Sequence, residues 1–416
     1  MVPWPIPIPS NSPFTLANLP YGVFSTSSKS VFCLNEKIFK SLKHLGKDSV
    51  FQDGDLAKFA GLPAVTRREW RKTLTDWLND PKSPLFDNAA VNAAIFVAVE
   101  DASMHLPFVI RAFTDFMCAD VHIENCSRLA GVSMPPSHYC MPLGYNGRAS
   151  SVVIAGESIH RPKGVLKNQQ DSTFLHQLSQ MVDYEAEIGI FVGQHLPTGK
   201  TITADQADDY IFGFVSLNDW SARDIQFAEM VPLGPLNGKA FATSISPWVV
   251  TFEAMKEHRC SSTVVDLREG GEARVPHLCH KDAESTWDLE LEVSVLRPTS
   301  QGDTPILTSR SNLRDLRWSP GQMLAHLSSS GCGLNIGDLV GTGTISSPND
   351  SPSLRTLGCL LELTEGGKKA TGTNQDEPLV YLHDGDEVII DVWNAARTIG
   401  FGHLRSRLLG LRVKSD

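Results

Sequence analysis

The stretch Asp183-Tyr-Glu-Ala-Glu-Ile-Gly-Ile-Phe-Val192 decides the fold class, because its polarity alternates with the period of a β-strand. Its even-numbered residues are mainly apolar, whereas Asp183, Glu185 and Glu187 occupy odd positions. Residues two apart on a strand point to the same face, so these carboxylates would lie together. They form either the solvated outer face of an antiparallel strand or a group that shares a cation. The pattern alone leaves both interpretations open.

Further strands are expected on both sides of this stretch, which makes the larger part of the chain mainly β with a few helices. These strands cover 151–155, 210–217, 289–296, 339–345 and 387–393. One helix is expected to start after Ser319-Pro320 and to run to about Ser329. The polar segments 297–311 and 364–378 are expected to be loops.

The N-terminal part has a different pattern. Short strands and turns are expected up to about residue 35, and helices over 53–60 and over 67–78, with Thr66 as the N-cap of the second. A chain of 416 residues is too long for one ordinary core. We therefore expect two domains, 1–107 and 108–416, that meet near Met104-His-Leu-Pro107.

The bulk composition narrows the class of protein. A formal net charge of −10 argues against nucleic acid as a partner, because no basic surplus offsets phosphate repulsion. No apolar run approaches the roughly 18 residues that a membrane span needs. The eight cysteines form no CxxC pairs and are expected to be free thiols in a reducing compartment. With no secretory signal in the Pro-rich N-terminus, the cytoplasm is the expected location.

Three further motifs could carry chemistry, although each has an ordinary explanation. Asn218-Asp-Trp-Ser-Ala-Arg-Asp224 follows an apolar strand and is either a functional cluster or a turn with a local ion pair. Phe113-Thr-Asp-Phe-Met117 places a carboxylate between aromatic residues, where it is costly unless it is paired or bound to metal. The turn-rich segment 232–248 brings Lys239 and Thr243, and a solvated lysine is the usual explanation there.

Taken together, these segments resemble the fumarylacetoacetate hydrolase family. The matching segments follow the order of the family from about residue 100 to 410: Thr114-Asp-Phe116 with His122, Leu143-Gly-Tyr-Asn-Gly-Arg-Ala-Ser150, Tyr184 to Gly193, Asn218 to Gln226, Val231-Pro-Leu-Gly-Pro235 with Gly238-Lys239, Thr243-Ser-Ile-Ser-Pro-Trp-Val-Val250, and Gly343-Thr-Ile-Ser346.

The resemblance implies a fold and a metal site. The fold is a small N-terminal SH3-like barrel followed by a large C-terminal mixed β-roll, and the family is usually a homodimer. The metal positions of the family fall on Asp115, Glu185, Glu187 and Asp219, with Lys239 and Thr243 beside them. An all-oxygen ligand set suits Mg²⁺ or Ca²⁺ better than zinc.

The resemblance also implies an activity. Family members cleave a carbon–carbon bond in a β-diketo acid, converting fumarylacetoacetate to fumarate and acetoacetate in the catabolism of aromatic amino acids. The general base of the family falls on His122 and its orienting carboxylate on Glu362, whereas Arg223, Gln226 and Lys239 match the donors to the oxyanion. One such donor is typically worth about 3–4 kcal/mol.

The positions that contact substrate match less closely. They fall on Arg128, Tyr145, Gln226, Thr344, Met117 and Met230. The two methionines stand where the family presents tyrosines, and Asn146 stands in place of a usual histidine. A pocket with these two methionines is expected to be more apolar and more adaptable than the pocket usual in the family.

Two alternatives to the hydrolase therefore stay open. One is a paralogue that acts on a less polar dicarbonyl by hydrolysis, decarboxylation or carbon–carbon bond formation. The other is an inactive metal-binding scaffold, against which the presence of His122, Glu362 and Lys239 counts.

Overall fold

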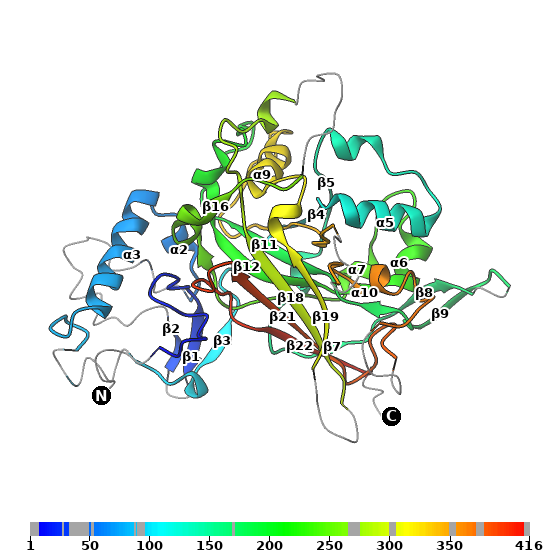
Figure 1. The fold of residues 1–416 in the computed structure, drawn as a ribbon, viewed down its shortest axis with the longest axis horizontal. Helices are drawn as coiled ribbons and strands as arrows, with labels where there is room; N and C mark the ends of the chain where they lie inside the picture. Colours follow the sequence, from blue (N-terminus) through cyan, green and yellow to red (C-terminus); the bar gives the residue numbers. More distant parts are fainter. Residues whose placement is uncertain are drawn as a thin grey trace.

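The computed structural model describes residues 8–26, 29–32, 50, 54–86, 89, 96–168, 171–264, 275–298, 305–348, 355–371 and 378–411. It is a mixed α/β fold made mostly of strands, in which two large sheets are surrounded by short helices (Figure 1). Among the described residues, no helix has both the length and the apolar character needed to cross a membrane.

The larger sheet carries most of the polar residues singled out above. Its strand order is β5-β4-β20-β11-β12-β14-β6, and β15 pairs separately with β12. The strands are β4 (Phe113–Met117), β5 (Leu143–Asn146), β6 (Val152–Ile154), β11 (Ala186–Val192), β12 (Ile211–Asp219), β14 (Thr243–Ile245), β15 (Val250–Thr251) and β20 (Leu339–Gly341). Strands β11 and β12 are antiparallel neighbours at its centre, and every residue in both is buried.

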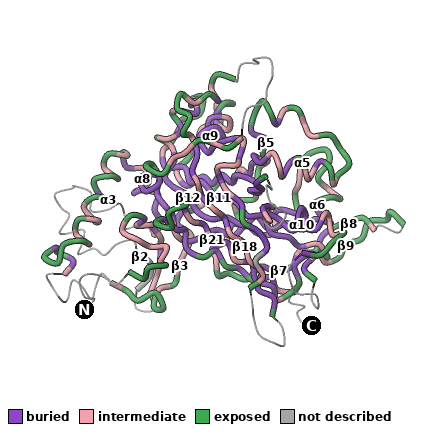
Figure 2. Tube along the Cα trace, viewed as in Figure 1, coloured by how far each residue is buried: buried purple, intermediate pink, exposed green. Residues whose placement is uncertain are grey.

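A second sheet covers one face of this centre. Its strand order is β19-β18-β21-β22-β7. The strands are β7 (Ile159–His160), β18 (Leu289–Leu296), β19 (Pro305–Asn312), β21 (Glu387–Asn394) and β22 (Leu404–Leu409). Ile188 and Ile190 of β11 share one hydrophobic core with Leu291 and Val293 of β18. Figure 2 shows this buried core as the purple centre of the molecule.

The N-terminal region covers the opposite face of the same strands. It contains a three-stranded sheet, β2-β1-β3, and two helices. Its elements are β1 (Val23–Thr26), β2 (Lys29–Phe32), β3 (Ser103–His105), α2 (Ala57–Ala60) and α3 (Ala64–Leu78). Phe108, which follows β3, packs on Phe191 of β11 with ring centroids 4.6 Å apart. The SH3-like barrel stays a prediction, since residues 33–49 lie outside the described part of the chain.

The remaining elements surround the two large sheets. The helices are α5 (Asp120–Ala130), α6 (Arg223–Glu229), α7 (Asn237–Ala240), α8 (Phe252–Met255), α9 (Pro320–Ser328) and α10 (Leu360–Leu363). Three two-stranded ribbons add β8 (Lys163–Lys167) with β9 (Phe174–Leu178), β10 (Val182–Asp183) with β13 (Ser221–Ala222), and β16 (Arg259–Cys260) with β17 (Thr286–Trp287).

Most of the strands expected from the sequence are confirmed, but their environment differs. The interpretation of Glu185 and Glu187 as a solvated outer face is wrong, because both side chains are buried. Lys239 and Arg223 contact Glu185, and the backbone N–H of Gly343 contacts Glu187. The loop expected over 297–311 is also wrong in part. Residues 305–312 form an edge strand, which pairs antiparallel with β18.

Two helix starts differ from the sequence expectation. Helix α3 begins at Ala64 after Pro63, without a side-chain cap, so Thr66 lies inside its first turn. Helix α2 covers only 57–60, and residue 53 lies outside the described part of the chain. The start of α9 is confirmed, with a complete capping box between Ser319 and Gln322.

The capping box gives a test of local stability. We expect Ser319→Ala to lower the free energy of unfolding by about 1 kcal/mol, because the backbone N–H of Gln322 loses its acceptor. Chemical denaturation followed by circular dichroism measures this, with Ser329→Ala at the exposed end of the same helix as the control. Equal stability of the two variants would contradict the capping role.

Candidate active site

Three strands of the larger sheet bring four carboxylates together. Asp115 lies on β4, Glu185 directly precedes β11, Glu187 is the second residue of β11, and Asp219 ends β12. One oxygen from each of the four lies within 4.8 Å of the others, and all four residues are buried. The residues that the sequence grouped as a metal set therefore lie side by side in space.

Two glycines make room for these carboxylates. Gly341 of β20 pairs with both Asp115 and Gly189, so it lies between β4 and β11. A Cβ atom at Gly341 would lie 2.6 Å from Asp115 Oδ1 and 2.8 Å from Glu187 Oε2, which is too close for any larger residue. Gly343, which has a φ of +75°, donates its backbone N–H to Glu187 Oε2 over 2.9 Å.

The cluster has the features of a cation site. Asp115 Oδ1 and Glu187 Oε1 are buried and have no hydrogen-bond partner among the described residues, which is costly unless a cation meets them. Burial, together with the neighbouring carboxylates, raises the pKa of Asp115 to about 8 and that of Glu187 well above its usual range. Four carboxylates fit a hard divalent cation such as Mg²⁺ or Ca²⁺.

Two buried cationic side chains hold the opposite edge of the cluster. The Lys239 ammonium contacts Glu185 and lies 2.5 Å from Asp219 Oδ2, and Arg223 Nη1 lies 2.8 Å from Glu185 Oε1. Burial acts to raise the pKa of Glu185, but these two cations lower it below its usual value. An ammonium group cannot coordinate a metal, so Lys239 neutralises ligands and is not one itself.

Asp219 is fixed in addition by two hydroxyl groups. Thr243 donates to Asp219 Oδ1 over 2.7 Å, and Tyr145 donates to Asp219 Oδ2 over 2.8 Å. These bonds orient the carboxylate toward the other three.

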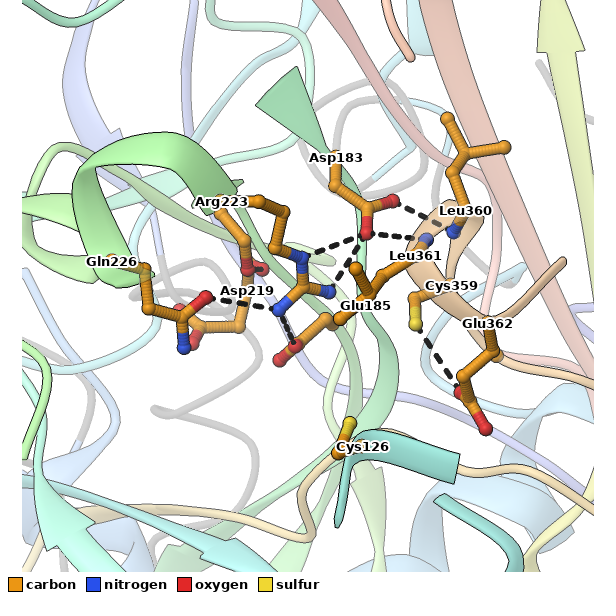
Figure 3. A network of polar contacts seen from close by, with 12 residues as sticks. Cys126, Asp183, Glu185, Asp219, Arg223, Gln226, Cys359, Leu360, Leu361 and Glu362 are labelled. Carbon is orange, nitrogen blue, oxygen red and sulfur yellow. Dashed lines mark hydrogen bonds and ion pairs between the residues drawn. The ribbon is translucent and has the colours of Figure 1, made fainter. Parts of the chain in front are cut away.

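Asp183 connects this cluster to helix α10. It forms an ion pair with Arg223 and accepts the backbone N–H groups of Leu360 and Leu361 over 2.7 and 2.9 Å (Figure 3). Arg223 also donates to Gln226 Oε1 over 3.1 Å, so its guanidinium joins three side chains. The sequence showed Asp183 on the carboxylate face but gave no sign of its contact with α10.

A histidine–carboxylate pair faces the cluster. His122 Nδ1 lies 2.7 Å from Glu362 Oε2, with the histidine on α5 and the glutamate on α10. Glu362 also accepts from Asn125 and Ser346 and contacts the Cys359 thiol. Burial acts to raise the pKa of Glu362, but His122 and the other donors lower it, so the carboxylate stays charged. A charged partner at Nδ1 fixes the imidazole with Nε2 directed away from it.

A cavity of about 370 Å³ lies between the carboxylates and this pair. Of the residues predicted to form the site, its lining contains Asp115, Met117, His122, Tyr145, Glu185, Arg223, Gln226, Met230, Lys239 and Thr344. Glu187, Asp219, Thr243 and Glu362 lie behind that surface as buried supports. Thr344 Oγ1 is buried without a hydrogen-bond partner among the described residues, so it is free to bond a ligand in the cavity.

Arg128 is the one predicted residue that is not brought to this site. It is exposed on α5 and contacts Asn125, which lies outside the cavity lining, so its substrate contact stays a prediction. The sequence interpretation also missed Asn125 and Cys126. Both lie one helical turn after His122 on α5. A helix predicted over these residues would have placed all three side chains on one face.

The fold and the site together define a mostly β protein with a buried carboxylate cluster, suited to a divalent cation, beside a cavity. Family models described as Fumarylacetoacetase N-terminal and Fumarylacetoacetate (FAA) hydrolase C-terminal match residues 17–107 and 111–409. The chain belongs to the fumarylacetoacetate hydrolase family.

Several proteins are similar over almost the whole chain. The fumarylacetoacetase of Bos taurus is 35% identical and that of Caenorhabditis elegans 36%, and each alignment covers 97% of this chain and 98% of the relative. A solved structure, described as a putative HpcE protein from Mycobacterium smegmatis, is 17% identical with a TM-score of 0.50, and covers 93% of this chain and 99% of that one. The relatives are named as hydrolases, and the solved structure supports the fold.

The carboxylate cluster gives a test of cation binding. We expect Asp115→Asn to weaken the binding of Mg²⁺ or Ca²⁺ at least about tenfold, because the variant loses a charged ligand that has no other partner. Isothermal titration calorimetry measures the affinity, and the exposed Asp209→Asn is the charge-matched control. If both variants bind as the parent does, the cation site lies elsewhere.

Cation binding is also expected to release protons. With a pKa of about 8, Asp115 is mostly protonated at pH 7 in the cation-free protein, so a bound cation must displace its proton. The pKa of Glu187 is raised as well, so the affinity should rise by at least about tenfold per pH unit around neutral pH and level off only when both carboxyl groups are ionised. Calorimetry in buffers of different ionisation enthalpy counts the protons, and an affinity independent of pH would contradict the assignment.

Proposed function

We propose that this protein hydrolyses fumarylacetoacetate to fumarate and acetoacetate, a step in the catabolism of aromatic amino acids, in the cytoplasm. The observation that carries the proposal is similarity to proteins named fumarylacetoacetase over 97% of the chain. It is supported by the position of the His122–Glu362 pair and the carboxylate cluster on one cavity.

The carboxylates Asp115, Glu185, Glu187 and Asp219 would hold a divalent cation, for which Mg²⁺ and Ca²⁺ are the candidates. When bound, the cation supplies Lewis-acid stabilisation of the negative charge that develops on the dicarbonyl oxygens.

The side chains of the cavity carry out the remaining steps. Burial acts to lower the pKa of His122, but Cys126 and Glu362 raise it well above its usual value, and His122 acts as the base in its deprotonated form. In that form His122 takes a proton from water through Nε2, because Nδ1 is bonded to Glu362, and the activated water attacks one carbonyl carbon. Arg223, Gln226 and Lys239 reach the same cavity and donate to the oxygen that becomes negative. Tyr145 and Thr344 are placed to contact the substrate.

A second candidate is a reaction on a less polar dicarbonyl. It is favoured by the wall of the cavity near α5, where Met117, Ile123 and Leu129 are all apolar. Met230, on the α6 side, extends this surface. Two methionines offer no hydroxyl donors, so a polar substrate would lose about 1–3 kcal/mol for each charged-group contact.

An inactive scaffold is less well supported, since the residues proposed for water activation and oxyanion binding lie on the same cavity as the carboxylates. The family resemblance also supports a homodimer in solution, which sedimentation velocity would test. We expect no nucleic-acid partner, because a formal net charge of −10 leaves no basic surplus to offset phosphate repulsion.

Hydrolysis by the parent protein and by the variant His122→Gln, which lacks the proposed base, tests the proposal directly. With Mg²⁺ or Ca²⁺ present, we expect cleavage of fumarylacetoacetate that EDTA abolishes and that His122→Gln slows by about 10²- to 10⁴-fold, because water loses its proton acceptor. Absorbance of the substrate follows the reaction, and calorimetry shows whether the variant still binds the cation.

The pattern of failure separates the alternatives. Metal-dependent cleavage of larger, more apolar diketo acids, without cleavage of fumarylacetoacetate, would support the second candidate. Activity that His122→Gln leaves unchanged would contradict the role of the base.

A further inference from the structure

Cys126 lies beside the proposed base without a place in the proposed hydrolysis. It follows His122 by four residues on α5, so the two side chains share one face of the helix. Cys126 Sγ lies 3.5 Å from His122 Nε2, within hydrogen-bonding distance for sulfur. The thiol is half-buried and lines the cavity of about 370 Å³.

The three residues have the geometry of an activated thiol. Glu362 occupies His122 Nδ1, which leaves Nε2 as the ring nitrogen that can accept the thiol proton. Glu362 is itself held by Asn125 and Ser346, so the imidazole has a fixed orientation. Cys126 Sγ lies 3.5 Å from Nε2 and 3.9 Å from Nδ1, so the thiol lies beside the imidazole ring and closer to its unoccupied nitrogen. Nucleophile, base and orienting carboxylate are thus in mutual contact, as in activated cysteines.

The surroundings of Cys126 favour a small carbonyl compound as its partner. On the same cavity, Lys239, Arg223 and Gln226 offer N–H donors, and Thr344 offers a buried hydroxyl that has no partner among the described residues. These groups can bind a carboxylate or a ketone oxygen. An alkene conjugated to such a carbonyl would then lie within the cavity that the thiol faces.

We propose that Cys126 is a covalent modification site for alkenes conjugated to a carbonyl group, with His122 as the base that activates the thiol. The thiol proton passes to His122 Nε2, and the thiolate forms a C–S bond to the β-carbon of the alkene as the C=C π bond breaks. The resulting enolate takes the proton back from His122 at the α-carbon. The net reaction is addition of the thiol across the double bond, and it needs no oxidant or further reactant.

The fumaroyl half of the proposed substrate contains such an alkene, and this part of the inference rests on the proposed function. An adduct on Sγ would occupy the space in front of His122 Nε2, where water must bind for hydrolysis. Occasional addition in place of hydrolysis would therefore inactivate the enzyme with its own substrate.

The other described cysteines provide internal references. Cys118 and Cys359 are buried, and burial raises the pKa of both thiols well above the usual range. Cys140 and Cys332 are exposed, and their thiols contact backbone carbonyl oxygens. Exposed thiols should react at the ordinary rate and buried thiols should stay unlabelled unless the protein unfolds.

The test is a labelling experiment on the full chain with Mg²⁺ present. The probes are N-ethylmaleimide and dimethyl fumarate, and peptide mass spectrometry gives the rate at each cysteine. We expect Cys126 to react about tenfold faster than Cys140 and Cys332 near neutral pH, because only Cys126 has an imidazole within 3.5 Å that can take its proton. We expect His122→Gln to remove this advantage while the rates at Cys140 and Cys332 stay the same, and Cys126→Ser to remove the fast adduct.

Two results would overturn the proposal: a rate at Cys126 no higher than at the exposed thiols, or a fast rate that His122→Gln leaves unchanged. Labelling of Cys118 and Cys359 reveals an unfolded variant, in which case Glu362→Gln replaces His122→Gln. The readout is a mass, so it is independent of hydrolysis. If Cys126 is labelled fast in a protein that does not cleave fumarylacetoacetate, the activation of the thiol is supported. Only the proposal that fumarylacetoacetate is the substrate then fails.

Discussion

The burial of several carboxylates at one place in a β-sheet is the constraint on which the rest of this structure depends. Asp115, Glu187 and Asp219 come from β4, β11 and β12 of one sheet, and their buried charges would repel one another strongly if all three were ionised without a cation. Lys239 and Arg223 compensate for part of this repulsion. The carboxylate oxygens that have no hydrogen-bond partner among the described residues, Asp115 Oδ1 and Glu187 Oε1, favour a divalent cation that would compensate for the rest. A fold that brings these carboxylates together is therefore most stable when the cation is bound.

Local features of this fold could be predicted from the sequence, because they depend on neighbours along the chain. The alternation of 289–296 and the cap at Ser319 predicted β18 and the start of α9. The spacing of Glu185 and Glu187 predicted a shared face, and only the family resemblance joined them to Asp115 and Asp219. Burial of these two side chains could not be read from the alternation, since the residues that cover them, Lys239, Arg223 and Gly343, come from segments distant in the sequence.

The remaining parts of the site depend on contacts between distant segments. Ser346 and Cys359 approach Glu362 through the packing of α10, and nothing in their local sequence signals it. The edge strand at 305–312 is polar, so its pattern favours a loop until β18 provides a partner. The described residues of the N-terminal region contribute no side chain to the cavity lining. Its contact between Phe108 and Phe191 covers the strand that carries Glu187, which indicates a supporting role.

Asp183 binds the backbone of α10 on one side and Arg223 on the other, while Arg223 binds Glu185 and α10 carries Glu362. A continuous series of ion pairs and hydrogen bonds therefore connects the carboxylate cluster to the helix that carries the partner of the base. If a cation bound at one end changes the affinity of His122 for its proton, protonation of His122 changes the affinity for the cation by the same factor. Such reciprocity would couple cation binding to the protonation state of His122, so that the site would not react before its cation is bound.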